Sequence, residues 1–334
     1  IALGDKARML FMQKKYDEAI KLYSEILSND YLFDGETKCG LLSLYSLCYF
    51  QKKDYKNALS INKKHRDFIK NSIGINNIEY IYALSDLYTI SIESTDYPNA
   101  INIAKEILQI HEHIPVFTED AHYKYLLLLA DAYFYNKNLN EAIELYETIL
   151  ESSSGSLWYE CATQLSNAYF SIESDKKALN LTDSIIKFVE IEYGKQSIEY
   201  IKALGDLVYQ MSYSNTSANN DIENFTTKLH KEIIETKIDN INASEDIGLL
   251  YTIAQSYLAL GYTTEHDSIF KYRLEIIKNM YGEKHPFYIT ELCNVLTNNY
   301  TYDLDKNIIA AKQLEEKYLQ DTINYQTSIH KHIL

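Results

Sequence analysis

The stretch LLLLADAYFYNKNLNEAIELYETIL, from Leu126 to Leu150, determines the fold expected for this chain of 334 residues. Its first part places apolar residues at three- and four-residue spacing on one helical face: Leu126, Leu129, Ala130 and Tyr133. The polar run NKNLN, residues 136–140, ends that pattern, and a second helical pattern follows. The stretch therefore predicts two antiparallel helices joined by a short turn.

The second helix of this stretch recurs along the sequence. An alanine followed by an apolar residue marks each copy, at Ala19, Ala58, Ala100, Ala142 and Ala178, with spacings of 39, 42, 42 and 36 residues. A small residue at the same point of each copy allows a neighbouring helix to approach closely. We therefore expect a bulky residue at Ala130 or Ala142 to overpack a helix crossing, at about 1 to 3 kcal/mol.

A second pattern marks the junctions between helix pairs. The segments GINNIEYIYALSDL from Gly74, GKQSIEYIKALGDL from Gly194 and GEKHPFYITELCNV from Gly282 align without a gap. Each has Ile or Pro four residues after the glycine and Tyr two residues later. A glycine after a helix supplies a left-handed stop, and Ile or Pro opens the next helix.

These residues resemble the tetratricopeptide repeat family, whose pattern of large, small and aromatic positions is matched between Leu126 and Tyr146. The long period and the run YGEKHP, Tyr281 to Pro286, are similar to the kinesin-light-chain type of this repeat. The resemblance implies an all-α fold, a right-handed α-α superhelix of about eight antiparallel helix pairs. Each pair buries its apolar face only by stacking on its neighbours.

The resemblance covers the chain as one solenoid over residues 1–334, with two departures. A polar insertion at about residues 212–222 interrupts the sixth repeat, where Asn224 or Phe225 stands in the region of the small residue. His266 takes that place in the seventh repeat. Residues 300–334 are expected to form a degenerate last repeat or a capping helix.

The charge of the chain disfavours several classes of partner. Lys and Arg number 32 and Asp and Glu 47, which gives a net charge of −15. Nucleic acids and anionic membranes attract basic surfaces, so we expect neither as a partner. No apolar run of about 18 residues is present, so membrane insertion of this segment is not expected.

The sequence does not fix the location or the oligomeric state of the protein. It begins at Ile1 and not at Met, which favours a fragment or a processed product. A cytoplasmic location is favoured, and a periplasmic one stays open if Ile1 is a processed terminus.

The sequence contains no linear signature of catalysis, such as a P-loop or H-E-x-x-H. Its four cysteines are far apart and are expected to be small buried residues. His111 and His113 lie two apart, so a helix would point them in different directions, and we interpret them as solvated. No catalytic residue, metal site or cofactor is therefore predicted, and the protein is not expected to be an enzyme.

The exposed face of the first helix of each pair is the predicted binding surface. Its candidate residues combine tyrosines with scattered polar groups: Tyr82, Ser85, Thr89, Lys124, Asp131, Tyr135, Asn167, Tyr209, Tyr251 and Gln255. One subtype of the family clamps a terminal carboxylate with several cations, and that cluster is absent here. Tyrosine offers rigid contact area with one polar tip, which suits a mixed apolar and hydrogen-bonding peptide.

Two functions follow from this reading. The first is a non-catalytic scaffold that binds a peptide segment or a partner domain on the concave face of the superhelix. The second is the regulatory or sensor region of a larger protein, because the resemblance extends to repeats joined to caspase-like peptidase domains or to membrane signalling receptors. An enzyme would require a catalytic constellation assembled from separate repeats.

Overall fold

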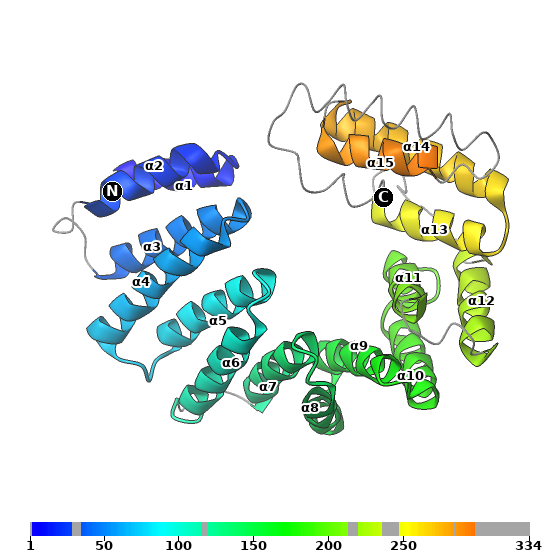
Figure 1. The fold of residues 1–334 in the computed structure, drawn as a ribbon, viewed down its shortest axis with the longest axis horizontal. Helices are drawn as coiled ribbons and strands as arrows, with labels where there is room; N and C mark the ends of the chain where they lie inside the picture. The colour runs from blue at the N-terminus through cyan, green and yellow to red at the C-terminus, as the bar shows by residue number, and fades with distance from the viewer. Residues whose placement is uncertain are drawn as a thin grey trace. The chain divides into compact units, whose positions relative to one another are not determined.

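The computed structural model describes residues 2–28, 35–114, 119–212, 220–235, 247–283 and 285–297 (Figure 1). Within these ranges it consists of helices joined by turns and contains no strand. The chain divides into two compact units, Ile1–Ser174 and Asp175–Leu334. Unit 1 contains α1 (Ala2–Met12), α2 (Tyr16–Ser28), α3 (Gly35–Gln51), α4 (Tyr55–Ile73), α5 (Ile78–Glu93), α6 (Tyr97–His111), α7 (Glu119–Tyr135), α8 (Leu139–Ser152) and α9 (Gly155–Ser171). Unit 2 contains α10 (Asp175–Tyr193), α11 (Ile198–Ser212), α12 (Asn220–Glu235), α13 (Ile247–Ala259), α14 (Thr263–Tyr281) and α15 (Pro286–Thr297).

Helices pack against their neighbours in chain order. In each unit the extensive contacts join consecutive helices, and the remaining ones join helices two apart, such as α7 with α9 and α11 with α13. This is the nearest-neighbour stacking expected of helical repeats. The predicted all-α fold of stacked antiparallel helix pairs is confirmed.

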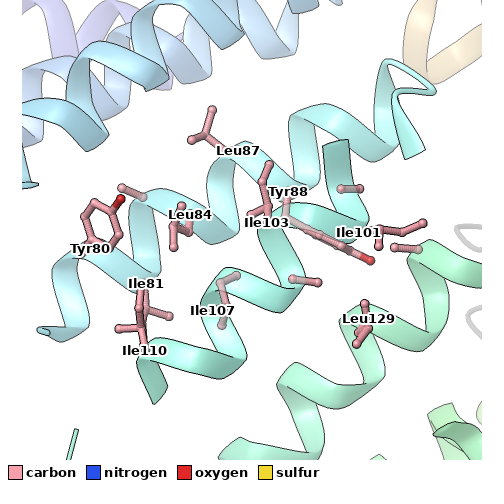
Figure 2. Packing of buried hydrophobic residues seen from close by; sticks show 14 of the residues in the cluster. Tyr80, Ile81, Leu84, Leu87, Tyr88, Ile101, Ile103, Ile107, Ile110 and Leu129 are labelled. Carbon is pink, nitrogen blue, oxygen red and sulfur yellow. The ribbon is translucent and has the colours of Figure 1, made fainter. Parts of the chain in front are cut away.

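The core between α5, α6 and α7 shows how the repeat buries its apolar face. Figure 2 shows Leu84 and Leu87 of α5 and Ile107 of α6 among the buried side chains of this cluster. Ala100 and Ala104 of α6 are fully buried in the same cluster. Small residues there let the helices approach, as the recurring alanine predicts.

The second helices share one burial register. Counted from the recurring small residue, positions four and seven residues later are buried in α2, α8 and α10, as in Tyr146 and Ile149 of α8. The same register in α12 starts at Thr226, because His230 and Ile233 are buried there. The burial register thus refines the sequence reading, which placed Asn224 or Phe225 in this region, to the adjacent Thr226. His266 is buried at this position in α14, as predicted.

A recurring turn joins the two helices of a pair wherever the structure describes the connection. The backbone of Lys53, Thr95, Lys137 and Glu173 has a φ of 59° to 66°, and Gly261 takes the same place in α13–α14. In each turn the next residue donates its amide to a carbonyl five residues back, as Asp54 does to Tyr49 at 2.9 Å. This is the hydrogen-bond pattern of a Schellman motif, which satisfies carbonyls at the helix end.

The glycines at the pair junctions behave nearly as predicted. Gly74 and Gly282 follow α4 and α14 with φ near 88° and extended ψ values of −171° and 158°. This region is essentially restricted to glycine, and it differs from the left-handed helical stop that the sequence indicates. The following helices open at Ile78, Ile198 and Pro286 as predicted.

The larger organisation of the chain stays a prediction. A single solenoid over residues 1–334 is not tested by the two separate units. Most of the predicted insertion, residues 213–219, and the last segment, residues 300–334, lie outside the described residues. Within the described ranges, no helix combines the length and the hydropathy that crossing a bilayer requires.

Candidate functional site

The first helices of the pairs carry a polar side chain at one recurring position. Counted back from the turn residues Lys53, Thr95, Lys137, Glu173 and Gly261, this position holds Thr89 in α5, Asp131 in α7, Asn167 in α9 and Gln255 in α13, and Leu47 takes it in α3. Asp86 of α5 and Asp206 of α11, each 12 residues after a junction glycine, lie one helical turn before Thr89 and Tyr209. We call the side of the first helices that bears these residues the first-helix face. Burial raises the pKa of Asp86 and of Asp206, although both side chains stay accessible to solvent. Accessible carboxylates surrounded by protein are typical of a recessed surface.

In unit 2 this face contains a pocket of about 370 Å³, the α11–α13 pocket. It is lined by Gly205 and Tyr209 of α11, His230 of α12, and Tyr251, Thr252 and Gln255 of α13. Three of the ten residues predicted from sequence therefore come together at one site. Tyr209 and Tyr251 are 60% and 41% exposed, so both residues can contact a ligand.

His230 adds a buried polar group to the α11–α13 pocket. Its side chain is 7% exposed, and its Nδ1 has no hydrogen-bond partner among the described residues. Burial lowers its pKa, so the ring is neutral at physiological pH. An unpaired buried nitrogen is costly, and a bound group that pairs with it would recover that cost.

Gly205 allows α11 and α13 to approach each other beside this pocket. A Cβ atom built on Gly205 would lie 2.4 Å from Cγ2 of Thr252, which is closer than van der Waals contact permits. The glycine thus sets the spacing of the two helices that carry Tyr209 and Tyr251.

Unit 1 contains a second, smaller pocket of about 100 Å³ on the same face, the α3–α5 pocket. It is lined by Leu47 and Phe50 of α3, Asn62 of α4, and Asp86, Thr89 and Ile90 of α5. Its plan repeats that of the α11–α13 pocket, with two successive first helices and the second helix between them. Asn62 and His230 occupy the same register of their helices, four residues after the small position.

Asp131 lies on the first-helix face, and its carboxylate is hydrogen-bonded to a buried residue of the core. The hydroxyl of buried Tyr146 in α8 donates to its Oδ1 at 2.6 Å. Burial raises the pKa of Asp131 to about 6, while the Tyr146 hydrogen bond opposes this shift and Glu160 of α9 adds to it. At neutral pH the site therefore holds a carboxylate whose charge the fold disfavours.

Replacement of Asp131 with asparagine is expected to stabilise the protein at pH 7 by about 2 kcal/mol, because the variant removes a disfavoured charge. In the wild type, the folded state takes up a proton near pH 6 and the unfolded state near about pH 4. The wild type therefore gains stability from this group as the pH falls through that window, and the difference between the proteins closes below it. Thermal melts at pH 7.5, 6 and 4 would measure this difference. Glu18→Gln, on exposed α2, serves as the control, and a less stable Asp131→Asn at pH 7 would contradict the assignment.

The other predicted residues of unit 1 have varied surroundings. Tyr82 and Lys124 are exposed, and Thr89 lines the α3–α5 pocket. Ser85 donates to the carbonyl of Ile81 at 2.9 Å, within its own helix. The ring of Tyr135 stacks on Tyr97 with centroids 5.8 Å apart, and Asn167 donates to Gln164 at 3.4 Å. These residues share a face, but the structure does not gather them into one pocket.

The histidine interpretation needs a correction. His113 is exposed, but His111 is only 7% exposed. Its ring stacks on that of His122 at 5.7 Å between centroids and meets the ring of Tyr125 edge-on at 5.2 Å. The helix continues through His111, so its ring turns inward onto α7 instead of into solvent. Among the described residues, no group of three or more metal-ligating side chains is found.

Sequence reasoning missed four residues that line or flank these pockets: Asn62, Asp86, Asp206 and His230. A signal for two of them was present, because GINNIEYIYALSDL and GKQSIEYIKALGDL both place an aspartate 12 residues after the junction glycine, one helical turn before the predicted residues Thr89 and Tyr209. Asn62 and His230 lie on second helices, which the sequence assigns to packing.

Comparison with known proteins bears on the fold. No protein-family profile matches the sequence. No curated protein matches it significantly either. Solved structures match at low identity. The apo form of RapI has a TM-score of 0.54 at 12% identity and covers 83% of this chain and 97% of its own.

Two further structures are similar to this chain. A STAND signal-transduction ATPase with a tetratricopeptide repeat sensor from Pyrococcus horikoshii has a TM-score of 0.54 at 17% identity, and the match covers 82% of this chain and 41% of that protein. The apo quorum sensor NprR from B. thuringiensis has a TM-score of 0.50 at 12% identity, over 97% of this chain and 86% of its own. Similarity at this level concerns the fold alone. The chain therefore has the stacked helix-pair fold of the tetratricopeptide-repeat proteins.

Proposed function

We propose that this protein is a non-catalytic scaffold that binds a peptide segment of a partner protein on its first-helix face, with the α11–α13 pocket as the anchoring site. The observation that carries this proposal is the convergence of Tyr209, Tyr251 and Gln255 around buried His230. Aromatic walls with a few polar groups are typical of peptide-binding pockets. Each group has a distinct use there.

Tyr209 and Tyr251 supply contact area with little loss of side-chain entropy, because a tyrosine has few rotatable bonds. Gln255 carries both a donor and an acceptor, which matches the amide groups of a peptide backbone. His230 lies deeper and would pair with a polar group that enters the pocket. Together these groups favour a partner segment with an apolar side chain flanked by backbone amides.

The chemistry of the buried thiols supports a non-catalytic role. Burial raises the pKa of Cys48 to about 11 and that of Cys161 to about 12. Both thiols are therefore protonated at neutral pH and are poor nucleophiles. Two solved structures of the same fold are called sensors, the quorum sensor NprR and the STAND protein, which is consistent with a binding role on this scaffold.

A second candidate function is the sensor region of a larger protein. The specific observation is that the matched part of the STAND protein, which carries a repeat sensor, is 41% of that chain. In that case, ligand binding in the α11–α13 pocket would change the activity of a neighbouring domain. The full reading frame around this chain tests this candidate, because it either encodes a signalling or peptidase domain or does not.

The binding proposal is tested by selecting ligands from a random peptide library displayed on phage, with the whole chain as bait. We expect the selected peptides to bind Tyr209→Ala and Gln255→Ala variants about 10 to 100 times more weakly, as for contacts at the centre of an interface. Tyr193→Ala on α10 is the matched control, because Tyr193 is exposed on a second helix. Equal binding by all variants, with unchanged melting temperatures, would contradict the proposal.

A further inference from the structure

The α3–α5 pocket has a hydrogen-bonding capacity that points to one kind of ligand. The hydroxyl of Ser46, which also lines it, donates to the carbonyl of Ala58 at 3.0 Å. The hydroxyl of Thr89 donates to the carbonyl of Ser85 at 3.0 Å. Both hydroxyl hydrogens are therefore in use, and these two oxygens offer only lone pairs to a ligand.

Asn62 supplies a third acceptor and the most specific one. It is 1% exposed, and its Oδ1 has no hydrogen-bond partner among the described residues. Its Nδ2 faces Oδ2 of Asp86 at 3.5 Å. The opposite orientation of the amide would place two oxygens against each other, so chemistry fixes Oδ1 as the unpaired atom.

Asp86 brings a negative charge to the same pocket. Burial raises its pKa, the hydrogen bond from Asn62 opposes this shift, and no Lys or Arg of the described residues contributes to it. Its carboxylate nevertheless stays accessible to solvent. A carboxylate that is surrounded by protein and has no cation beside it would gain more from a bound cation than a fully solvated carboxylate does.

The remaining walls are mostly apolar, with Ser43 as a further polar residue. Leu47, Phe50 and Ile90 line the pocket beside the acceptors. Its volume of about 100 Å³ exceeds the ~15 Å³ that one water molecule needs, but leaves little room for a broad planar group. An ammonium group has three donors and no acceptor, and an alkyl stem would lie along the apolar side.

We propose that the α3–α5 pocket binds a primary alkylammonium group, supplied by a lysine side chain of a partner protein. Asp86 neutralises the charge, Asn62 Oδ1 and the oxygens of Ser46 and Thr89 accept its hydrogens, and Leu47 and Ile90 cover the methylenes. The ammonium chemistry depends only on this pocket, whereas the lysine source rests on the proposed peptide-binding function. A free alkylamine is the other source of the same chemistry.

Methyl NMR of the whole chain tests the pocket directly, because Ile90 and Leu47 place methyl groups in it. Titration with n-butylammonium is expected to shift both methyl signals. The neutral analogue 1-pentanol and N-butyltrimethylammonium, which cannot donate hydrogen bonds, are expected to shift neither. Asp86→Asn should weaken butylammonium binding at least about tenfold, and Asn62→Ala should weaken it several-fold.

Glu18→Gln provides a matched control, since it removes one exposed charge from α2 without touching the pocket. It is expected to bind like the wild type. Methyl signals that do not respond to butylammonium, that respond equally to pentanol, or that respond unchanged in Asp86→Asn would overturn the proposal. Circular dichroism melts check that each variant is folded.

A second titration identifies the source of the ammonium group. The acetylated and amidated tripeptide Ala-Lys-Ala should shift the two methyl signals at lower concentration than butylammonium, and the norleucine version should not. If only the free amine binds, the ammonium chemistry stands and the lysine source is wrong. The peptide-library selection can fail without affecting this result, because that selection depends on the α11–α13 pocket.

Discussion

Replacement of Glu291 with alanine is expected to lower the free energy of unfolding by about 3 to 5 kcal/mol. Glu291 and Arg273 form an ion pair and are only 7% and 5% exposed. The Nε of Arg273 also donates to the carbonyl of Ile247 at 2.9 Å, and its guanidinium lies over the ring of Tyr251 at 5.1 Å. Loss of the carboxylate would leave a buried positive charge without its counterion.

The sequence context explains why this pair exists. In the aligned junction segments, Glu291 takes the place of Ala83 and Ala203, which are both buried. A buried carboxylate at that position would be unfavourable without a counterion, and the guanidinium of Arg273 in α14 supplies one. The pair therefore acts as one unit, and removal of one partner should cost more than removal of both.

Urea denaturation followed by circular dichroism would measure these effects. The double variant Arg273→Met with Glu291→Leu is expected to recover most of the lost stability, because it removes both charges and keeps apolar volume. Glu283→Ala is the control, since the pair of Lys278 and Glu283 is exposed and should contribute less than about 1 kcal/mol. A Glu291→Ala variant as stable as this control would show that the pair is not buried.

Replacement of Tyr146 with alanine is the second large effect, expected at about 3 to 5 kcal/mol. Its side chain is fully buried in α8, and its backbone carbonyl accepts the thiol of Cys161 at 3.2 Å. The truncation would open a cavity between α7, α8 and α9. Thermal or urea unfolding of purified protein would give the change in free energy.

The conservative variant Tyr146→Phe separates the ring from the hydroxyl. It keeps the packing but removes the donor to Asp131, so we expect a loss of about 1 to 3 kcal/mol at pH 7. The loss should shrink when Asp131 is also replaced with asparagine, because no charge then depends on the hydroxyl. Equal losses for phenylalanine and alanine would assign the whole effect to the hydrogen bond and contradict the packing argument.

Much of the fold could be predicted because each repeat contains, within its own sequence, the residues that determine how its two helices pack. The recurring alanines fix which face of each second helix packs, and Ala100 and Ala142 are fully buried as expected. The junction glycines fix where pairs begin. Such features depend on residues within one helix pair and its neighbour, so periodicity in the sequence is enough to find them.

The two pockets were harder to predict, because their buried polar residues lie on second helices and their exposed residues lie on first helices. Tyr209, Tyr251 and Gln255 lie on first helices and were found by their register. Asn62 and His230 occupy a position that in other repeats holds Ala104 or Thr182, both buried packing residues. Only the stacking of three successive helices shows that these two side chains line pockets.

Burial of His111 was missed for a related reason. Two histidines near the end of a helix indicate solvent exposure when only their own helix is considered. The neighbouring α7 covers His111 through His122 and Tyr125, which follow it by more than ten residues. A contact between two helices decides the environment, and sequence spacing alone does not contain it.

The central claim, that a partner segment lies on the first-helix face, is tested most directly by site-specific photo-crosslinking. The photoreactive residue p-benzoylphenylalanine would replace Tyr209 on α11 or, as the comparison, Tyr193 on α10, both exposed tyrosines. A library-selected peptide is expected to crosslink at position 209 and not at position 193. Crosslinking at position 193 alone, or equally at both positions, would contradict the claim.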